Sequence, residues 1–221
     1  MCNLYSMTKG QQAIREMARA THDRTGNLPP FPAIFPDYAA PIVRNGPEGR
    51  ELTLARWGMP SPVLALKGKK CDPGVTNVRN VKSPHWRRWL GMENRCLVPF
   101  TSFSENEALP DGAHPTVWFA LDETRPLAFF AGIWTRWTSV RKVKEGETTN
   151  DLFAFLTTEA NKLVGAIHPK AMPVVLTTPE EIDLWMTAPA EEALRLQRPL
   201  ADDILRIVAR GGKQDDGGLA A

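Results

Sequence analysis

The 221-residue sequence has few cysteines and no long apolar run. Its three cysteines, at positions 2, 71 and 96, lack metal-ligand spacing, so we expect neither a disulfide framework nor a zinc site. No apolar run approaches the roughly 20 residues that a membrane helix needs, and the opening MCNLYSMTKG lacks the charged and apolar regions of a signal peptide. We therefore expect a reduced, cytoplasmic protein without a membrane partner, a metal or a cofactor.

The sequence also lacks an internal repeat, a glycine-rich phosphate loop and a clear linker. Hydrophobic residues make up 43% and charged residues 24%, which is ordinary for a globular protein and excludes a disordered one. Strand-like runs outnumber helical ones and do not alternate regularly with them, which favours a single α+β domain over a parallel α/β sheet. We assign residues 1–210 to this domain and expect the tail 211–221, GGKQDDGGLAA, to be disordered.

Local patterns predict four helices and a larger number of strands. One helix is expected over about 9–20, because Thr8 and Gln11 form a T-x-x-Q capping box. A second is expected over 159–167 behind Thr158, and a third behind Thr178, with Pro179 at its first position. The fourth covers about 190–196. Strands are expected at 51–59, 62–66, 96–103, 116–121, 127–134, 152–157, 173–177 and 204–209. The proline-rich stretch 27–41 excludes a helix and favours short extended segments.

The net charge of +2 is the sum of two oppositely charged halves. Residues 1–100 carry a net charge of +8, and residues 101–221 carry −6. Nine basic residues between positions 56 and 95 stand against only Asp72 and Glu93, with Trp57, Trp86 and Trp89 interleaved. Cations that meet phosphates beside aromatic rings that stack on bases suit a groove for single-stranded nucleic acid. The alternative is a solvated face with core tryptophans, which this pattern alone leaves open.

Cys2 is the most informative residue. Methionine before a small residue is normally removed in the cell, which would leave Cys2 at the N-terminus with both a thiol and an α-amine. Their reference pKa values are about 8.5 and about 7.7–8.0, so both groups are partly nucleophilic at neutral pH. The amine can condense with an aldehyde to an imine, and the thiol can then close a thiazolidine ring. Taken alone, a residue at position 2 is more often part of a frayed terminus.

Six motifs occur in a fixed order along the chain. They are MCN at the start, ARWGMPSP (55–62), TNVRN (76–80), RCLVPFTSFSEN (95–106), AGIW (131–134) and LTTEANKLVGAIHPKAMPVVL (156–176). From Cys2 to about Trp185, this set resembles the SOS response-associated peptidase (SRAP) family of abasic-site processing proteins. The resemblance implies one α+β domain with a central antiparallel, barrel-like sheet flanked by helices, and a basic DNA groove.

The resemblance also implies catalytic residues. Cys2 matches the nucleophile, Asn77 the residue that supports the reacting centre, and Arg79 a phosphate contact. Glu105 and His168 match an acidic residue and a histidine suited to proton transfer. Without the resemblance, these positions also fit a polar turn, a charge at a strand end and a residue that complements a helix dipole.

Further positions are expected to contact DNA. Trp57 and Gly58 match a W-G pair that lines the DNA side, although Trp57 also fits the core. Arg87 and Arg88 belong to the basic segment, and Lys170 is expected to bind a phosphate.

The sequence departs from the family pattern at three places. Asn3 stands where glycine is common, Asn106 replaces an aromatic residue after Glu105, and HPKAMP is one residue longer than the usual H-x-R-M-P and lacks its arginine. Asn106 cannot stack on a base, and Lys170 would act as a point charge instead of a bidentate fork. The departures bear on DNA contacts more than on the four catalytic positions.

The function implied by the resemblance is DNA-damage processing. After loss of Met1, Cys2 would crosslink to abasic sites in single-stranded DNA as a thiazolidine, which shields the lesion, and lyase and autopeptidase activity would accompany this chemistry. The protein is expected to act as a monomer and to associate with the nucleoid when bound to DNA. Two alternatives from other classes remain, namely a thiol amidohydrolase with an N-terminal nucleophile, such as a glutaminase, and a non-catalytic module that binds single-stranded DNA.

Overall fold

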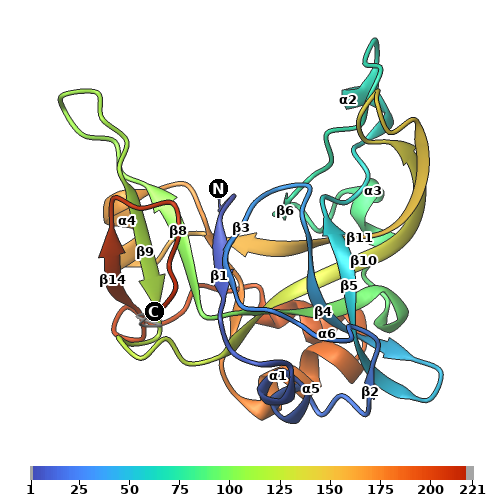
Figure 1. The fold of residues 1–221 in the computed structure, drawn as a ribbon, viewed down its shortest axis with the longest axis horizontal. Coiled ribbons are helices and arrows are strands. Elements are labelled where there is room, and N and C mark those ends of the chain that lie inside the picture. Colours follow the sequence, from blue (N-terminus) through green and yellow to red (C-terminus); the bar gives the residue numbers. More distant parts are fainter. Residues whose placement is uncertain (1, 218–221) are drawn as a thin grey trace.

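A closed barrel of five strands lies at the centre of the computed structural model, which describes residues 2–217 (Figure 1). The barrel strands are β4 (Ala39–Gly46), β5 (Gly49–Trp57), β7 (Arg95–Phe100), β10 (Ala128–Val140) and β11 (Glu147–Thr158). They follow the spatial order β5, β4, β7, β10 and β11, and each neighbouring pair is antiparallel. A parallel pairing of β11 with β5, at Leu152 and Arg56, closes the barrel. The expected single α+β domain with a central antiparallel, barrel-like sheet is confirmed.

Aromatic rings fill the barrel. Phe100 and Phe130 stack with 3.9 Å between ring centroids, and Tyr5 contacts Trp57 edge-on at 5.1 Å. All four side chains are fully buried. Aromatic pairs in such geometry contribute about 0.5–1.5 kcal/mol beyond their buried area. Because Tyr5 follows Cys2 by only three positions, its packing fixes the first residues of the chain against the barrel.

A second sheet holds the start of the chain beside β8. Its order is β14 (Arg206–Arg210), β9 (Thr116–Ala120), β8 (Ser102–Asn106), β1 (Tyr5–Met7) and β3 (Phe31–Ile34). Strand β1 runs antiparallel to β8 with Tyr5 opposite Phe103. The pairing reaches back to Leu4, whose carbonyl accepts a hydrogen bond from the Ser104 N–H at 3.0 Å. The residues before β1 therefore lie next to Glu105.

Short elements complete the fold. The remaining strands are β2 (His22–Asp23), β6 (Asn77–Val78), β12 (Met172–Pro173) and β13 (Val175–Leu176). The helices are α1 (Gln11–Ala18), α2 (Val63–Leu66), α3 (Pro84–Arg87), α4 (Lys162–Ile167), α5 (Pro179–Thr187) and α6 (Ala190–Ala193), with 3₁₀ turns at Met92–Asn94 and Leu194–Leu196. Helices α1, α5 and α6 gather below the barrel in Figure 1. Over residues 2–217, every helix is too short or too polar to cross a bilayer.

Two of the expected helix starts are wrong, and one is confirmed. Helix α1 begins at Gln11 and is not capped by Thr8, whose hydroxyl lies 3.3 Å from that of Thr101. Helix α4 begins three residues later than expected, because Thr158 ends β11 and the Asn161 side chain accepts the capping hydrogen bond at 3.0 Å. Helix α5 begins as predicted, since the Thr178 hydroxyl accepts the Glu181 N–H at 3.2 Å.

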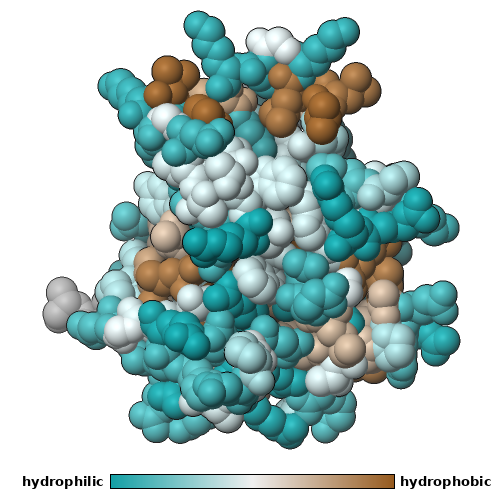
Figure 2. Space-filling model, turned by 90° about the vertical axis from the view of Figure 1, so that its right-hand side faces the viewer, coloured by the Kyte–Doolittle hydropathy of each residue, from teal (hydrophilic) through white to brown (hydrophobic). Residues whose placement is uncertain are grey.

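Several strands also differ from expectation. The run 62–66 forms α2 instead of a strand, because its exposed apolar side chains have no neighbouring strand to pair with. Figure 2 shows apolar side chains at this upper end of the molecule, surrounded by hydrophilic ones. The single strand expected at 96–103 is two strands, and Thr101 between them marks the change from the barrel to the second sheet. The proline-rich stretch contains β3 and the start of β4, so its extended segments pair into sheets.

The C-terminal segment 211–217 is ordered by contacts with the second sheet, in contrast to the expected disorder. The carboxylate of Asp215 is buried and accepts hydrogen bonds from the Ser102 hydroxyl at 2.5 Å and from Arg125 Nε at 2.9 Å. Its backbone N–H donates to the carbonyl of Pro32 at 2.9 Å. Residues 218–221 of the expected tail lie outside the described residues.

Candidate functional site

The four predicted catalytic residues come from separate elements and meet at one place. Cys2 precedes β1, Asn77 opens β6, Glu105 lies on β8 and His168 caps the C-terminus of α4. The Asn77 side chain donates a hydrogen bond to the Cys2 carbonyl at 2.8 Å, and His168 Nε2 lies 4.0 Å from Glu105 Oε2. The negative charge of Glu105 is also close enough to raise the pKa of the Cys2 thiol. The structure thus joins a thiol, an amide, a carboxyl and an imidazole.

The Cys2 thiol is deeply buried. Its side chain is 1% exposed, and Sγ lies 3.5 Å from the Leu4 carbonyl, to which the thiol donates. Burial first, and then the charge of Glu105, raise the pKa of this thiol well above its ordinary value. The thiol is therefore protonated at neutral pH, and chemistry at sulfur requires a nearby group that accepts its proton.

Asn77 fixes the peptide that follows Cys2. Strand β6 pairs with β11, with Asn77 opposite Phe155, which holds the amide below the start of the chain. Its Nδ2 also contacts the Thr76 hydroxyl at 2.8 Å, and this hydroxyl donates to Asn3 Oδ1 at 2.9 Å. Its Oδ1 is buried and has no hydrogen-bond partner among residues 2–217. A buried acceptor beside Cys2 can receive an N–H or O–H from a reacting group.

Glu105 is suited to proton transfer at neutral pH. It is almost fully buried near the end of β8. Burial raises its pKa from 4.5 to about 7. A carboxyl with this pKa exists in both protonation states near pH 7, so it can donate and accept protons without a large free-energy cost.

His168 lies across from Glu105 in the neutral form. Its backbone N–H donates to the Val164 carbonyl at 2.7 Å and ends helix α4. Partial burial lowers the pKa of its imidazole below 6.5, and the nearby charge of Lys170 contributes. A neutral imidazole has one nitrogen able to accept a proton, which complements the partly protonated Glu105.

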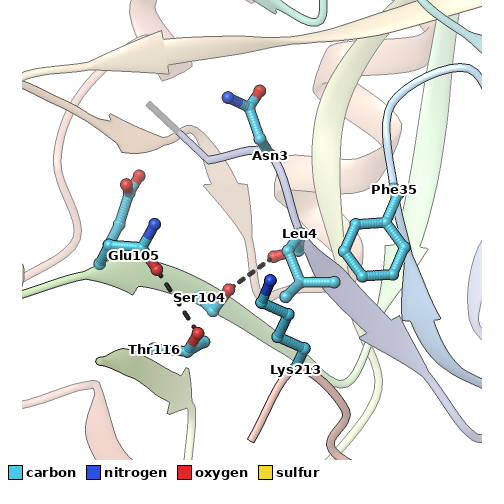
Figure 3. Close-up of a pocket in the computed structure, with 8 residues that line it drawn as sticks. Asn3, Leu4, Phe35, Ser104, Glu105, Thr116 and Lys213 are labelled. Carbon is cyan, nitrogen blue, oxygen red and sulfur yellow. Dashed lines mark hydrogen bonds between the residues drawn. The ribbon is translucent and has the colours of Figure 1, made fainter. Parts of the chain in front are cut away.

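A pocket of about 210 Å³ adjoins these residues (Figure 3). Its lining residues are Asn3, Leu4, Phe35, Ser104, Glu105, Asn106, Thr116 and Lys213. The Ser104 hydroxyl donates to the Leu4 carbonyl at 3.3 Å and holds the start of the chain at the pocket wall. Phe35 and Lys213 were not predicted from the sequence, because neither lies in a motif and Lys213 falls in the tail that was expected to be disordered.

Two of the expected phosphate contacts lie together beside the site. Arg79 Nη1 donates to the Lys170 carbonyl, and Arg79 Nη2 lies 3.9 Å from Glu159. The Arg79 side chain is half-exposed, and Lys170 is exposed two positions after His168. Both cations can therefore reach a polyanion that approaches the site.

Trp57 and Gly58 lie behind the site. The Trp57 ring is fully buried, stacks on Phe155 at 5.3 Å and donates from Nε1 to the Thr76 carbonyl at 3.1 Å. Gly58 has a φ of +139°, and a Cβ there would lie 2.4 Å from Arg141 Nη2. In this conformation neither residue offers a surface to DNA. Their roles are to support Thr76 and to permit close packing of Arg141.

The basic segment 56–95 is only partly a surface feature. Trp86 and Trp89 are buried, as in the alternative with core tryptophans. Arg56 is ion-paired to Asp37 at 2.6 Å. Arg87 and Arg88 are exposed at α3, which lies beyond β6 from the start of the chain in Figure 1. These two arginines can meet DNA only at a distance from Cys2.

Known proteins resemble this chain in sequence and fold. A family model described as SOS response associated peptidase (SRAP) matches residues 1–209. A crystal structure of a protein from Bordetella bronchiseptica aligns with a TM-score of 0.71 and 24% identity, over 93% of this chain and 97% of that one. A Bacteroides thetaiotaomicron protein gives a TM-score of 0.67 and 21% identity over 93% and 90%. A phage-related protein from Bordetella bronchiseptica gives 0.67 and 21% over 93% and 92%. No curated protein matches the chain.

Proposed function

Because the chain belongs to the SOS response associated peptidase (SRAP) family, whose name links it to the DNA-damage response, we propose that it forms a covalent crosslink to abasic sites in single-stranded DNA. Cys2 is the proposed point of attachment after removal of Met1. The observation that carries the proposal is the meeting of Cys2, Asn77, Glu105 and His168 at the start of the chain. The first nucleophile is the α-amine, since the buried thiol is protonated.

The first step is condensation of the Cys2 amine with the open-chain aldehyde of the abasic sugar. The amine nitrogen bonds to the aldehyde carbon and loses its two protons, and the carbonyl oxygen gains two protons and leaves as water. Protonated Glu105 is the proposed donor of one proton to the oxygen, and neutral His168 is the proposed acceptor of the amine protons, the first of which it passes on to the oxygen and the second of which it keeps. Asn77 orients the cysteine through its carbonyl and offers its open amide oxygen to the amine.

The second step closes the ring. The thiol sulfur bonds to the imine carbon, its proton passes to ionised Glu105, and the imine nitrogen takes up the proton held by His168 to become the ring amine. The sum of both steps is aldehyde plus aminothiol giving thiazolidine plus one water, without an oxidant or reductant. Ring closure removes the imine that would acidify the neighbouring carbon, and so suppresses strand cleavage by β-elimination. Residual lyase activity and hydrolytic self-release belong to the same proposal.

The DNA strand would approach on the side of Arg79 and Lys170. Both cations are accessible and lie next to His168, so phosphates bound there would place a neighbouring sugar near Cys2. Arg87 and Arg88 would bind phosphates farther along the strand. Binding that relies on such contacts weakens as salt concentration rises.

A denaturing gel tests the crosslink. Processed wild-type protein incubated with abasic single-stranded DNA should give a heat-stable band of reduced mobility. Cys2→Ala and a variant that retains Met1 should both give none, since one lacks the thiol and the other has an acylated amine. Cys71→Ala is the matched control and should crosslink like wild type. Undiminished crosslinking by Cys2→Ala would refute the proposal. Glutamine hydrolysis without the band would favour the amidohydrolase alternative, and reversible binding alone would favour a DNA-binding module.

A further inference from the structure

We propose that the C-terminal segment 211–217 contributes to DNA binding at the site. It places the Lys213 ammonium in the pocket beside Glu105, where the ammonium binds a phosphate of the DNA strand. This inference rests on the proposed function and adds a binding residue that the sequence motifs do not contain. Lys213 positions the strand and takes no part in the reaction at Cys2.

The segment is held firmly enough to position a side chain. Asp215, two residues after Lys213, is buried and receives hydrogen bonds from Ser102 and Arg125. Its backbone carbonyl accepts the Ser6 hydroxyl at 2.6 Å. Since Ser6 lies in β1 and Ser102 in β8, Asp215 joins the C-terminal segment to the strand that follows Cys2 and to the strand that carries Glu105. The same segment therefore moves with the reacting residues.

The Lys213 side chain reaches the pocket itself. Figure 3 shows it extending toward Leu4 and Ser104, on the opposite side of the pocket from Asn3. Over residues 2–217, its ammonium has no hydrogen bond or ion pair. In contrast, two nearby arginines already form ion pairs: Arg125 with Asp215 and Arg210 with Glu107. Lys213 can thus take an anion without first breaking an internal contact.

The pocket fits one phosphate better than a whole nucleotide. Its volume of about 210 Å³ lies below the roughly 300–1,000 Å³ of typical small-molecule sites. Besides Lys213, it offers polar groups from Asn3, Ser104 and Thr116, and one apolar wall from Phe35. A cation with hydroxyl and amide groups around it matches a phosphodiester with its flanking sugar oxygens. Lys213 lies across the pocket from Asn3, and Glu105 lines the same pocket, so a phosphate bound there would lie next to the lesion.

Binding can be separated from chemistry with an unreactive probe. The probe is single-stranded DNA with a reduced abasic site, which has no aldehyde, and its affinity is followed by fluorescence anisotropy at several salt concentrations. Lys213→Ala should bind about threefold to tenfold more weakly, and its log–log salt slope should fall by about 0.7, the value for one phosphate contact on a single strand. Lys213→Arg should restore both, and Lys144→Ala, an exposed lysine on the β10–β11 hairpin, should resemble wild type.

The crosslinking rate gives a second readout. At abasic DNA concentrations well below saturation, Lys213→Ala should crosslink about threefold to tenfold more slowly than wild type, because a smaller share of the protein is bound to DNA. An affinity and a salt slope equal to those of Lys144→Ala would overturn this inference while leaving the crosslink intact. Failure of wild-type protein to crosslink at all would instead overturn the proposed function.

Discussion

At the residue scale, the burial of the Glu105 carboxyl makes the stability of the folded protein depend on pH. Its pKa is about 7 in the folded protein and near 4.5 in the unfolded chain, so the folded state binds more protons between these values. Stability therefore falls as pH rises from about 4.5 to about 7. A carboxyl kept in such a place despite this cost is typical of a residue that transfers protons.

Glu105→Gln should remove this pH dependence. The variant cannot ionise, so its stability relative to wild type should increase by about 2–3 kcal/mol between pH 5 and pH 8. Urea denaturation at each pH measures the difference, with Glu123→Gln as an exposed control whose pH profile should follow wild type. A constant stability difference between Glu105→Gln and wild type over this range would show that the pKa of Glu105 is not raised by folding.

At the element scale, the C-terminal segment depends on one buried side chain. The side chain of Asp215 is 4% exposed and that of Arg125 is 14% exposed, so their ion pair is largely shielded from water. The Ser102 hydroxyl donates a hydrogen bond to the same Asp215 carboxylate. Replacing the Asp215 carboxylate with a neutral side chain leaves Arg125 without its ion-pair partner. It also weakens the contact between the C-terminal segment and β8.

Asp215→Asn should therefore lower the free energy of unfolding by about 1–3 kcal/mol. It should also weaken binding of DNA with the reduced abasic site to the level of Lys213→Ala, because Lys213 loses its support. Chemical denaturation and anisotropy measure the two effects, and Asp203→Asn provides an exposed control. Wild-type stability and affinity in Asp215→Asn would show that the segment is not anchored through this residue.

At the scale of the whole molecule, sequence patterns predicted the parts of the fold that depend on local chemistry. The buried runs of β9, β10 and β11 and the capping of α5 by Thr178 follow from residues that are neighbours in sequence. Strand β1 and the burial of Asp215 could not be predicted in this way, because both depend on partners about a hundred or more positions away. The family motifs indicated which four residues belong to the site, but not the pocket wall formed by Phe35 and Lys213.

The closed barrel brings the N-terminus, β6, β8 and the end of α4 together, and the proposed function depends on one covalent bond between Cys2 and DNA. Mass analysis of the proteolysed crosslink identifies that bond directly. We predict that the DNA is attached to the peptide beginning at Cys2, without Met1, with the loss of one water, and that borohydride treatment leaves the mass unchanged because no imine remains. Attachment at another residue, or a mass that rises by two hydrogens on reduction, would contradict it.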